Sequence, residues 1–203
     1  LIYSPTAKII MLTNPVDSMT YLVLKKFNLP KNRVIGMGGI LDTARFKYYI
    51  QEKLQKAADQ IQAIVIGGHG DQTMLPLARL ATFSGVSIVQ FLKKDELDEI
   101  VDKTMKGGAA LTNLLGTSAW VAPANALCEL VLAVLYDKKA LLACSVLLEG
   151  EYDEKDVCIG VPCIIGKDGV EKIIELPLID QEKSQFGNSV SAIKSINLEM
   201  MNL

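Results

Sequence analysis

The chain has 203 residues, of which 50% are hydrophobic and 22% are charged, and its formal net charge is −2. This composition is typical of a globular protein with enough apolar residues to form a core. We expect neither a nucleic-acid partner, because basic residues do not cluster, nor a membrane partner, because no apolar run reaches the roughly 18 residues of a span.

The first third of the chain alternates between short apolar runs and segments with helical spacing. The apolar runs at 7–12, 33–35 and 63–66 predict strands that end at turn-forming residues. Residues 16–27 and 41–54 carry apolar side chains at the spacing of amphipathic helices. This alternation favours an α/β arrangement with parallel strands.

The remaining two thirds change character. Helices are predicted at 96–115, 124–136 and 180–203, and strands at 141–148, 157–165 and 170–176, with a tight turn at 166–169. Runs of strands joined by tight turns indicate an α+β arrangement with antiparallel hairpins.

The four cysteines lie among apolar neighbours and lack the spacing of a zinc site. We expect Cys128, Cys144, Cys158 and Cys163 to be small buried residues of a protein in a reducing compartment, the cytoplasm. No metal site is predicted.

His69 is the only histidine, and it follows the apolar run 63–66 within a Gly-Gly-His-Gly-Asp segment. A lone histidine is more often a packed or surface residue than a catalytic one. However, ligand sites of open α/β sheets lie outside the carboxyl ends of strands, and glycines there allow the backbone to approach a ligand closely. Because imidazole exchanges protons near neutral pH, His69 is a candidate proton-transfer residue.

Three further polar residues are candidates for the same site. Asp42 and Arg45 are three residues apart on a predicted helix, so they share a face. This spacing fits a surface ion pair of little energetic value. It also fits a carboxylate that fixes the tautomer of an imidazole and an arginine that holds a substrate carboxylate through two hydrogen bonds. Asn14 ends the first strand, where its amide can donate to a ligand oxygen.

The glycine-rich segments do not form a complete nucleotide site. Residues 36–39 supply the first two glycines of a dinucleotide-binding fingerprint but lack the third, and no acidic residue follows at the required distance. The segment around His69 also fails this pattern. The chain therefore contains no complete site for dinucleotide phosphates.

Five segments together resemble the lactate/malate dehydrogenase family. They are Asn-Pro-Val-Asp at 14–17, Gly-Met-Gly-Gly-Ile-Leu-Asp-Thr-Ala-Arg at 36–45, Ile-Gly-Gly-His-Gly-Asp at 66–71, Gly-Thr-Ser-Ala-Trp-Val-Ala-Pro at 116–123 and Gly-Val-Pro-Cys-Ile-Ile-Gly-Lys-Asp-Gly-Val-Glu-Lys at 160–172. The resemblance covers essentially the whole chain and is strongest to the lactate-dehydrogenase-like malate dehydrogenases.

The resemblance implies roles for individual residues. His69 matches the proton donor and acceptor of the family, and Asp42 matches the carboxylate that pairs with it. Arg45 matches the residue that binds the substrate carboxylate. Asn14 matches a residue that contacts substrate and nicotinamide, with Leu12 and Thr13 beside the cofactor. Ser118 falls near the position that closes the substrate pocket.

The resemblance also implies a fold and a domain division. We expect the end of a Rossmann-type parallel sheet followed by the α+β substrate domain of the lactate/malate dehydrogenase fold. Residues 1–36 would be the C-terminal remnant of a dinucleotide-binding domain and residues 37–203 the substrate domain, with helix 118–136 packing back on the nucleotide domain. Since the chain begins at Leu1 and enters a strand almost at once, we expect the first part of the protein to be absent.

The implied function is that of an NAD-dependent malate dehydrogenase of the tricarboxylic acid cycle. It would act on a small 2-oxo or 2-hydroxy dicarboxylate as a dimer or tetramer of identical chains. One alternative is an L-lactate dehydrogenase, because the family's specificity loop precedes the segment that matches residue 1. Another is a non-catalytic truncated subunit or oligomerisation module. The chain alone is expected to be inactive and to associate through apolar surface at 7–12 and 124–136.

Overall fold

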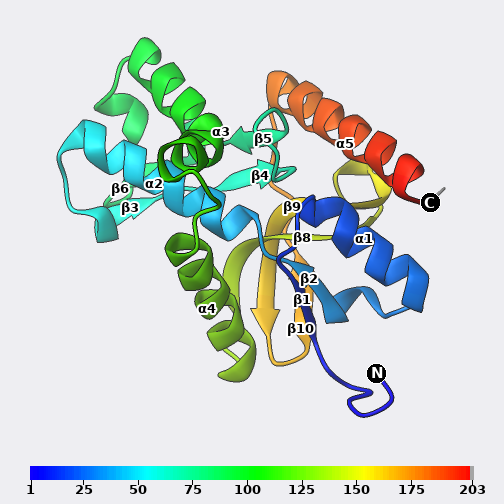
Figure 1. Ribbon diagram of the computed structural model, residues 1–203. Helices are drawn as coiled ribbons and strands as arrows, with labels where there is room; N and C mark the ends of the chain where they lie inside the picture. Colours follow the sequence, from blue (N-terminus) through cyan, green and yellow to red (C-terminus); the bar gives the residue numbers. More distant parts are fainter. Residues whose placement is uncertain (202–203) are drawn as a thin grey trace.

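The computed structural model describes residues 1–201, and a seven-stranded mixed sheet forms its centre (Figure 1). The strands run in the order β1-β2-β8-β9-β4-β5, and β10 pairs with β9. Their bounds are β1 Ile9–Met11, β2 Val34–Gly36, β4 Val65–Gly67, β5 Met74–Pro76, β8 Ala140–Glu149, β9 Lys155–Gly166 and β10 Gly169–Ile173. A separate small sheet contains β3 Ile61–Gln62, β6 Thr82–Phe83 and β7 Val86–Ser87.

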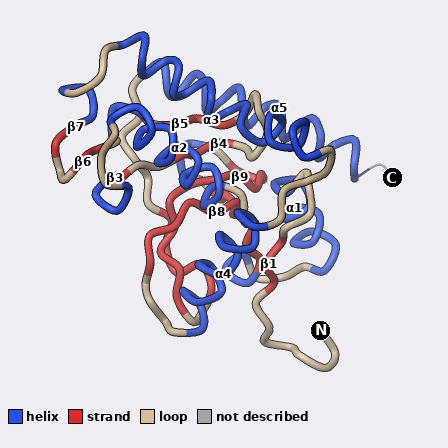
Figure 2. Tube along the Cα trace, turned by 60° about the vertical axis from the view of Figure 1, so that its left-hand side comes forward, coloured by secondary structure: helices blue, strands red, loops and turns tan. Residues whose placement is uncertain are grey.

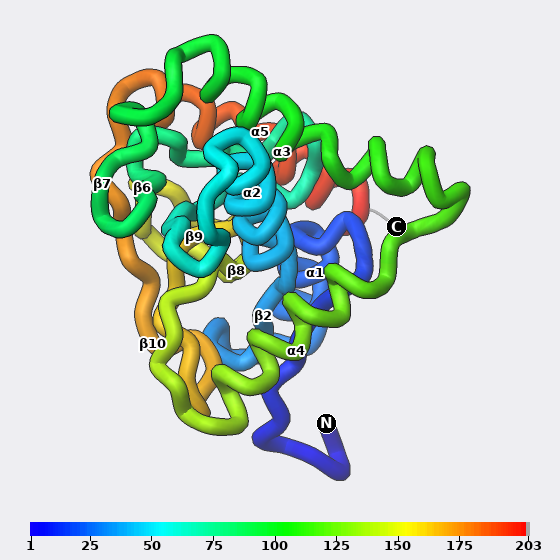
Figure 3. Tube along the Cα trace, turned by 90° about the vertical axis from the view of Figure 1, so that its left-hand side faces the viewer, coloured from blue at the N-terminus to red at the C-terminus, as the bar shows by residue number. Residues whose placement is uncertain are grey.

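Five α-helices surround these sheets. They are α1 Val16–Phe27, α2 Gly39–Leu54, α3 Lys94–Leu115, α4 Val121–Leu135 and α5 Asp180–Met201. Helices α1 and α5 lie side by side, whereas α4 runs along the β8–β9 hairpin (Figures 1 and 2). The last turns of α3 stand clear of the rest of the molecule (Figure 3). No helix within residues 1–201 is both long enough and apolar enough to cross a membrane.

Most of the predicted elements are present. Residues 16–27 form α1 with the expected bounds, and the predicted hairpin strands at 141–148 and 157–165 form β8 and β9. Helix α3 ends at Gly116, whose φ of 69° lies in the left-handed region that favours glycine. The short strands β3, β5, β6 and β7 were not predicted, because two or three residues carry too little periodicity to be recognised.

One expectation about strand direction is wrong. Strand β4, predicted at 63–66 as a further parallel strand, is antiparallel to both of its neighbours, β5 and β9. Among the strands within residues 1–201, only β1 and β2 form a parallel pair. The reason is that the long antiparallel hairpin of β8 and β9 lies between β2 and β4, so β4 cannot join the parallel pair.

The ends of β2 and β4 meet at one row of the sheet. Gly36, the last residue of β2, is opposite Ser145 of β8, which is opposite Gly160 of β9, which is opposite Gly67, the last residue of β4. Strand β2 reaches this row from one side and β4 from the other, because they run in opposite directions. The segment after β2 and the segment after β4 therefore both begin at this row of the sheet.

The cysteine prediction holds for three residues. Cys144, Cys158 and Cys163 are fully buried, but Cys128 is exposed on α4. The apolar neighbours of Cys128 indicated a buried position, yet α4 buries only the stripe formed by Ala126, Leu130 and Ala133. Cys128 lies on the opposite face of α4, because it is two positions away from both Ala126 and Leu130.

Candidate active site

His69 and Asp42 form a pair at the row where β2 and β4 end. His69 Nδ1 lies 2.7 Å from Asp42 Oδ2, although the two residues are 27 positions apart in the sequence. The carboxylate of Asp42 is almost completely buried, and 16% of the His69 side chain is exposed. The structure thus brings together the two residues that the sequence predicts as an acid–base pair.

Arg45 joins this pair through the same carboxylate. Its Nη1 donates to Asp42 Oδ1 at 3.1 Å, one turn along α2. An ion pair therefore forms between Asp42 and Arg45, and the same buried carboxylate also contacts the imidazole of His69. The Arg45 side chain is 20% exposed, so its guanidinium remains accessible to a ligand.

A cavity of about 420 Å³ gathers most of the predicted site residues. Leu12 and Asn14 enter it from the β1–α1 connection, Arg45 from α2, His69 from the β4–β5 connection and Ser118 from the α3–α4 connection. Thr13 is exposed but does not line the cavity, and Asp42 lies behind His69. Asp71 also lines it, so His69 is not the only titratable group at its surface.

The loop that carries His69 is held by short polar contacts. It begins at Gly67, whose φ of 85° favours glycine and whose Cβ, if present, would lie 2.4 Å from Thr73 O. Ser189 of α5 accepts a hydrogen bond from Gly68 N at 2.9 Å and donates to Thr73 O at 2.8 Å. Through Ser189, helix α5 therefore holds the loop at both Gly68 and Thr73, which limits the positions that His69 can adopt.

A second carboxylate contacts the His69 backbone. Asp17, in the first turn of α1, accepts a hydrogen bond from His69 N at 2.8 Å. Asp17 is only 6% exposed. Burial raises the pKa of Asp17 above its ordinary value of 3.8, while the nearby Ser145 side chain and the hydrogen bond from the His69 N–H oppose this rise. No role was predicted for Asp17, which entered the sequence analysis only as part of the segment at 14–17.

The surroundings of His69 favour its protonated form. Burial lowers the pKa of His69, but the hydrogen bond and charge of Asp42, together with the charge of Asp17, outweigh burial. The net result is a pKa above the ordinary value of 6.5, although the Arg45 charge opposes it. An imidazole with such a pKa can both hold and release a proton near neutral pH.

The glycine cluster at 36–39, which failed as a nucleotide fingerprint, makes room for the imidazole. A Cβ added at Gly38 would lie 2.9 Å from His69 Cγ, closer than real Cβ contacts allow, and 3.1 Å from His69 Nδ1. In contrast, a Cβ at Gly108 of α3 would lie 3.4 Å from Arg45 Nη1, which is an ordinary van der Waals distance. The fold therefore shows that the imidazole needs the space at Gly38.

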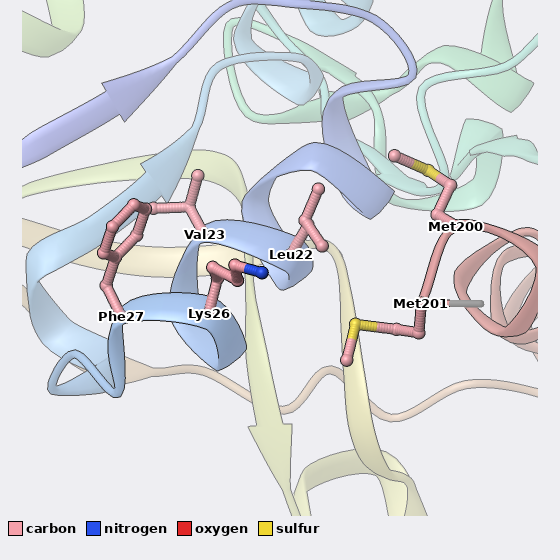
Figure 4. Close-up of a pocket in the computed structure, with 6 residues that line it drawn as sticks. All are labelled: Leu22, Val23, Lys26, Phe27, Met200 and Met201. Atoms are coloured by element: carbon pink, nitrogen blue, oxygen red, sulfur yellow. The ribbon is translucent and has the colours of Figure 1, made fainter. Parts of the chain in front are cut away.

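A second hollow contains no comparable chemistry. It lies between α1 and α5 and is lined by Leu22, Val23, Lys26, Phe27, Met200 and Met201 (Figure 4). Lys26 is its only titratable lining residue, so it contains no acid–base pair. Within residues 1–201, no group of three His, Cys, Asp or Glu residues is placed to hold a metal ion.

The arrangement around the cavity can perform two tasks at once. Arg45 can bind an anionic group through its planar fork of donors, and His69 can exchange a proton with an oxygen of the same ligand. The side-chain amide of Asn14, in the β1–α1 connection, can donate a hydrogen bond to the same ligand. A small, oxygen-rich anion that gains or loses a proton is the ligand that fits these groups.

The comparison with protein families covers the part of the chain that holds most of this site. The model of the lactate/malate dehydrogenase α/β C-terminal domain matches residues 40–202. The malate dehydrogenase of Flavobacterium johnsoniae is 54% identical over 195 residues, which cover 96% of this chain and 63% of the relative. The chain thus spans somewhat less than two thirds of the length of the curated relatives it matches.

Solved structures share the fold closely. The malate dehydrogenase from Aeropyrum pernix superposes with a TM-score of 0.94 at 42% identity, covering 97% of this chain and 66% of that one. The lactate dehydrogenase from Cryptosporidium parvum, complexed with lactic acid and β-nicotinamide adenine dinucleotide, gives a TM-score of 0.95 at 37% identity and covers 99% of this chain and 65% of that one. The expected fold class is confirmed.

Proposed function

The chain belongs to the lactate/malate dehydrogenase family, and on this premise we propose that it is the substrate-binding and proton-transfer part of an NAD-dependent malate dehydrogenase. The observation that carries the proposal is the position of Asp42 between His69 and Arg45, the latter two of which line one cavity. Relatives that are malate dehydrogenases support the choice of reaction.

Arg45 and Asn14 orient the substrate. The guanidinium of Arg45 binds the C1 carboxylate of malate through two parallel hydrogen bonds, which fixes the plane of that group. Asn14 donates to an oxygen of the substrate from the β1–α1 connection, and Ser118 closes the cavity from the α3–α4 connection. Held between these groups, the C2 hydroxyl of malate lies against His69.

His69 carries the proton. In the neutral imidazole, an Nδ1–H directed to Asp42 leaves Nε2 unprotonated and able to accept the proton of the C2 hydroxyl when malate is oxidised. The imidazolium that forms is stabilised by the buried Asp42 carboxylate. In the reverse direction Nε2 returns the proton to the carbonyl oxygen of oxaloacetate, so the two directions use the same atom.

NAD is the cofactor that we propose for this reaction. Leu12 and Asn14 fit the nicotinamide end, because they line the cavity with His69 and Leu12 exposes 44% of its surface there; Thr13 is exposed beside them. When bound, the nicotinamide supplies the acceptor for the hydride that leaves C2. Residues 1–203 contain no complete phosphate-binding fingerprint, so the remaining cofactor contacts must come from elsewhere.

The proposal is tested with the protein expressed from its complete gene. His69→Asn removes the proton acceptor, so turnover of malate should fall about 10²- to 10⁴-fold with little change in NADH affinity. Asp102→Asn, which removes an exposed partner of Lys106 on α3, serves as the control and should keep full turnover. Near-normal turnover of His69→Asn would contradict the proposed role.

Malate and lactate are separated by a direct assay. We propose malate, because the Ser118 segment and the Gly107–Gly108 pair resemble the malate enzymes. The protein from the complete gene should therefore reduce oxaloacetate with a much higher kcat/KM than pyruvate. A preference for pyruvate would establish the alternative, an L-lactate dehydrogenase.

We also propose that the chain alone is inactive and that it works as a dimer or tetramer of identical chains in the cytoplasm. Large apolar side chains support the association, since Trp120 is 74%, Val121 86% and Leu135 71% exposed. Calorimetry of residues 1–203 should detect weak binding of NADH or none, whereas micromolar binding would contradict this. Light scattering should show association, and a monodisperse monomer would count against it.

The same exposed surface favours the second candidate, a non-catalytic module that only assembles with other subunits. The protein from the complete gene decides between the two. It would be inactive with both oxaloacetate and pyruvate if the second candidate were right.

A further inference from the structure

Asp17 connects two parts of the site that are distant in the sequence. It lies three residues after Asn14, at the start of α1, and its Oδ2 accepts a hydrogen bond from the backbone N–H of His69, 52 positions away. This contact is buried, since Asp17 is 6% exposed. A charged acceptor makes such a hydrogen bond stronger than a neutral one.

The other side of the Asp17 carboxylate faces the sheet. Asp17 Oδ1 and Ser145 Oγ are both buried, and neither has a hydrogen-bond partner of good geometry within residues 1–201. Ser145 lies on the row of the sheet where β2 and β4 end. Burying a carboxylate oxygen without a full set of partners is costly, so packing alone does not account for an aspartate here.

We propose that Asp17 is a positioning residue for His69: its buried carboxylate fixes the backbone of the loop that carries the imidazole and ties that loop to the helix following Asn14. The inference rests on the function proposed above for His69. Asp17 also adds a second negative charge to the surroundings of the imidazole.

The charged groups around His69 come from three elements. Asp42 and Arg45 face it from α2, Asp17 from α1, and Asp71 follows it in the same loop and lines the same cavity. Asp42 bonds the ring directly, whereas Asp17 bonds the backbone. Removing the Asp17 charge should therefore lower the pKa of His69 without breaking the Asp42 contact.

The test uses the protein expressed from its complete gene. The imidazole Cε1–H resonance that disappears from the proton NMR spectrum in His69→Asn belongs to His69, and it reports the pKa of His69 directly, without substrate or cofactor. Asp17→Asn keeps an oxygen for the His69 N–H and offers an amide donor to Ser145, so the loop should stay in place. The titration midpoint of His69 should nevertheless shift to lower pH.

Asp156→Asn is the matched control, because it removes an equal charge near the other end of α1, where Asp156 binds Lys25 and Tyr21. Its His69 midpoint should equal that of the wild type. If Asp17→Asn also has the wild-type midpoint, the inference is overturned.

A second measurement addresses the backbone. In Asp17→Ala the His69 N–H loses its acceptor, so its hydrogen exchange should accelerate about 10- to 100-fold, whereas Asp17→Asn should retain most of the protection. Unchanged exchange in Asp17→Ala would overturn the positioning role. If circular dichroism shows that Asp17→Ala does not fold, the Asp17→Asn titration decides alone.

These outcomes are independent of the proposed function. A protein that lacks malate dehydrogenase activity but shows both NMR effects would refute the function and leave the link between Asp17 and His69 intact. An active protein with neither NMR effect would refute only the role of Asp17.

Discussion

Asp42 Oδ2 lies 2.7 Å from His69 Nδ1, while the other oxygen of the same carboxylate accepts a hydrogen bond from Arg45 at 3.1 Å. One buried carboxylate therefore orients both the imidazole of His69 and the guanidinium of Arg45. Because Asp42 and Arg45 share a helix turn and His69 comes from a different connection, α2 sets the distance between the two functions of the site.

The raised pKa of His69 predicts a pH-dependent stability. The folded protein binds this proton more tightly than the unfolded chain, so the stabilisation is fully present below the unfolded pKa of about 6.5. It is lost as pH rises through the higher folded pKa. Urea denaturation should show the free energy of unfolding falling with pH above about 6.5, and His69→Asn should flatten that decline. An equal decline in the variant would assign it to other groups.

Arg45→Lys should weaken substrate binding specifically. Lysine keeps the charge but cannot form the planar pair of hydrogen bonds with a carboxylate. Losing one charge-assisted bond costs about 1.5–3 kcal/mol, so KM for the substrate should rise about 10- to 100-fold. Arg33→Lys is the control, since Arg33 donates to the backbone carbonyl of Ala7 and does not line the cavity, and the KM of this variant should stay unchanged. Equal KM values in both variants would argue against the role of Arg45.

Gly38→Ala should impair catalysis because the added methyl group would occupy space that the His69 imidazole needs. Its Cβ would lie 2.9 Å from His69 Cγ, so the imidazole must move away from Asp42, and turnover should drop by about 10- to 100-fold. Gly187→Ala on α5 is the matched control, because no atom lies within 4 Å of its added Cβ. It should keep full turnover and raise the free energy of unfolding by about 0.5–1 kcal/mol. Full turnover of Gly38→Ala would show that the loop adapts.

Thiol labelling should distinguish Cys128 from the other cysteines. Burial raises the pKa of Cys163 to about 12 and the pKa values of Cys144 and Cys158 well above their usual range, so these three are unreactive as well as inaccessible. Mass spectrometry after brief treatment of the native chain with iodoacetamide should find label on Cys128 only. Labelling of a second cysteine under native conditions would contradict the burial described here.

The sequence was sufficient wherever a residue's role depends on its own segment. The spacing of apolar residues predicted α1 with its observed bounds. The glycines around His69 and the Asp42–Arg45 spacing made these residues candidates, and the family resemblance supplied their expected roles. The sequence was insufficient where partners come from distant segments. The antiparallel pairing of β4 depends on a hairpin about 80 residues later, and the contact between Asp17 and His69 leaves no trace in either local pattern.

The β8–β9 hairpin sets the spacing of the site through one row of paired residues, which is Gly36, Ser145, Gly160 and Gly67. Among the described residues, none from β8 or β9 lines the cavity, yet their pairing sets how far the end of β2 lies from the end of β4. A slip of one residue displaces a strand by about 3.3 Å, more than the whole His69–Asp42 separation of 2.7 Å. A change in the register of this hairpin would therefore disturb the contact between His69 and Asp42, although no described residue of the hairpin lines the cavity.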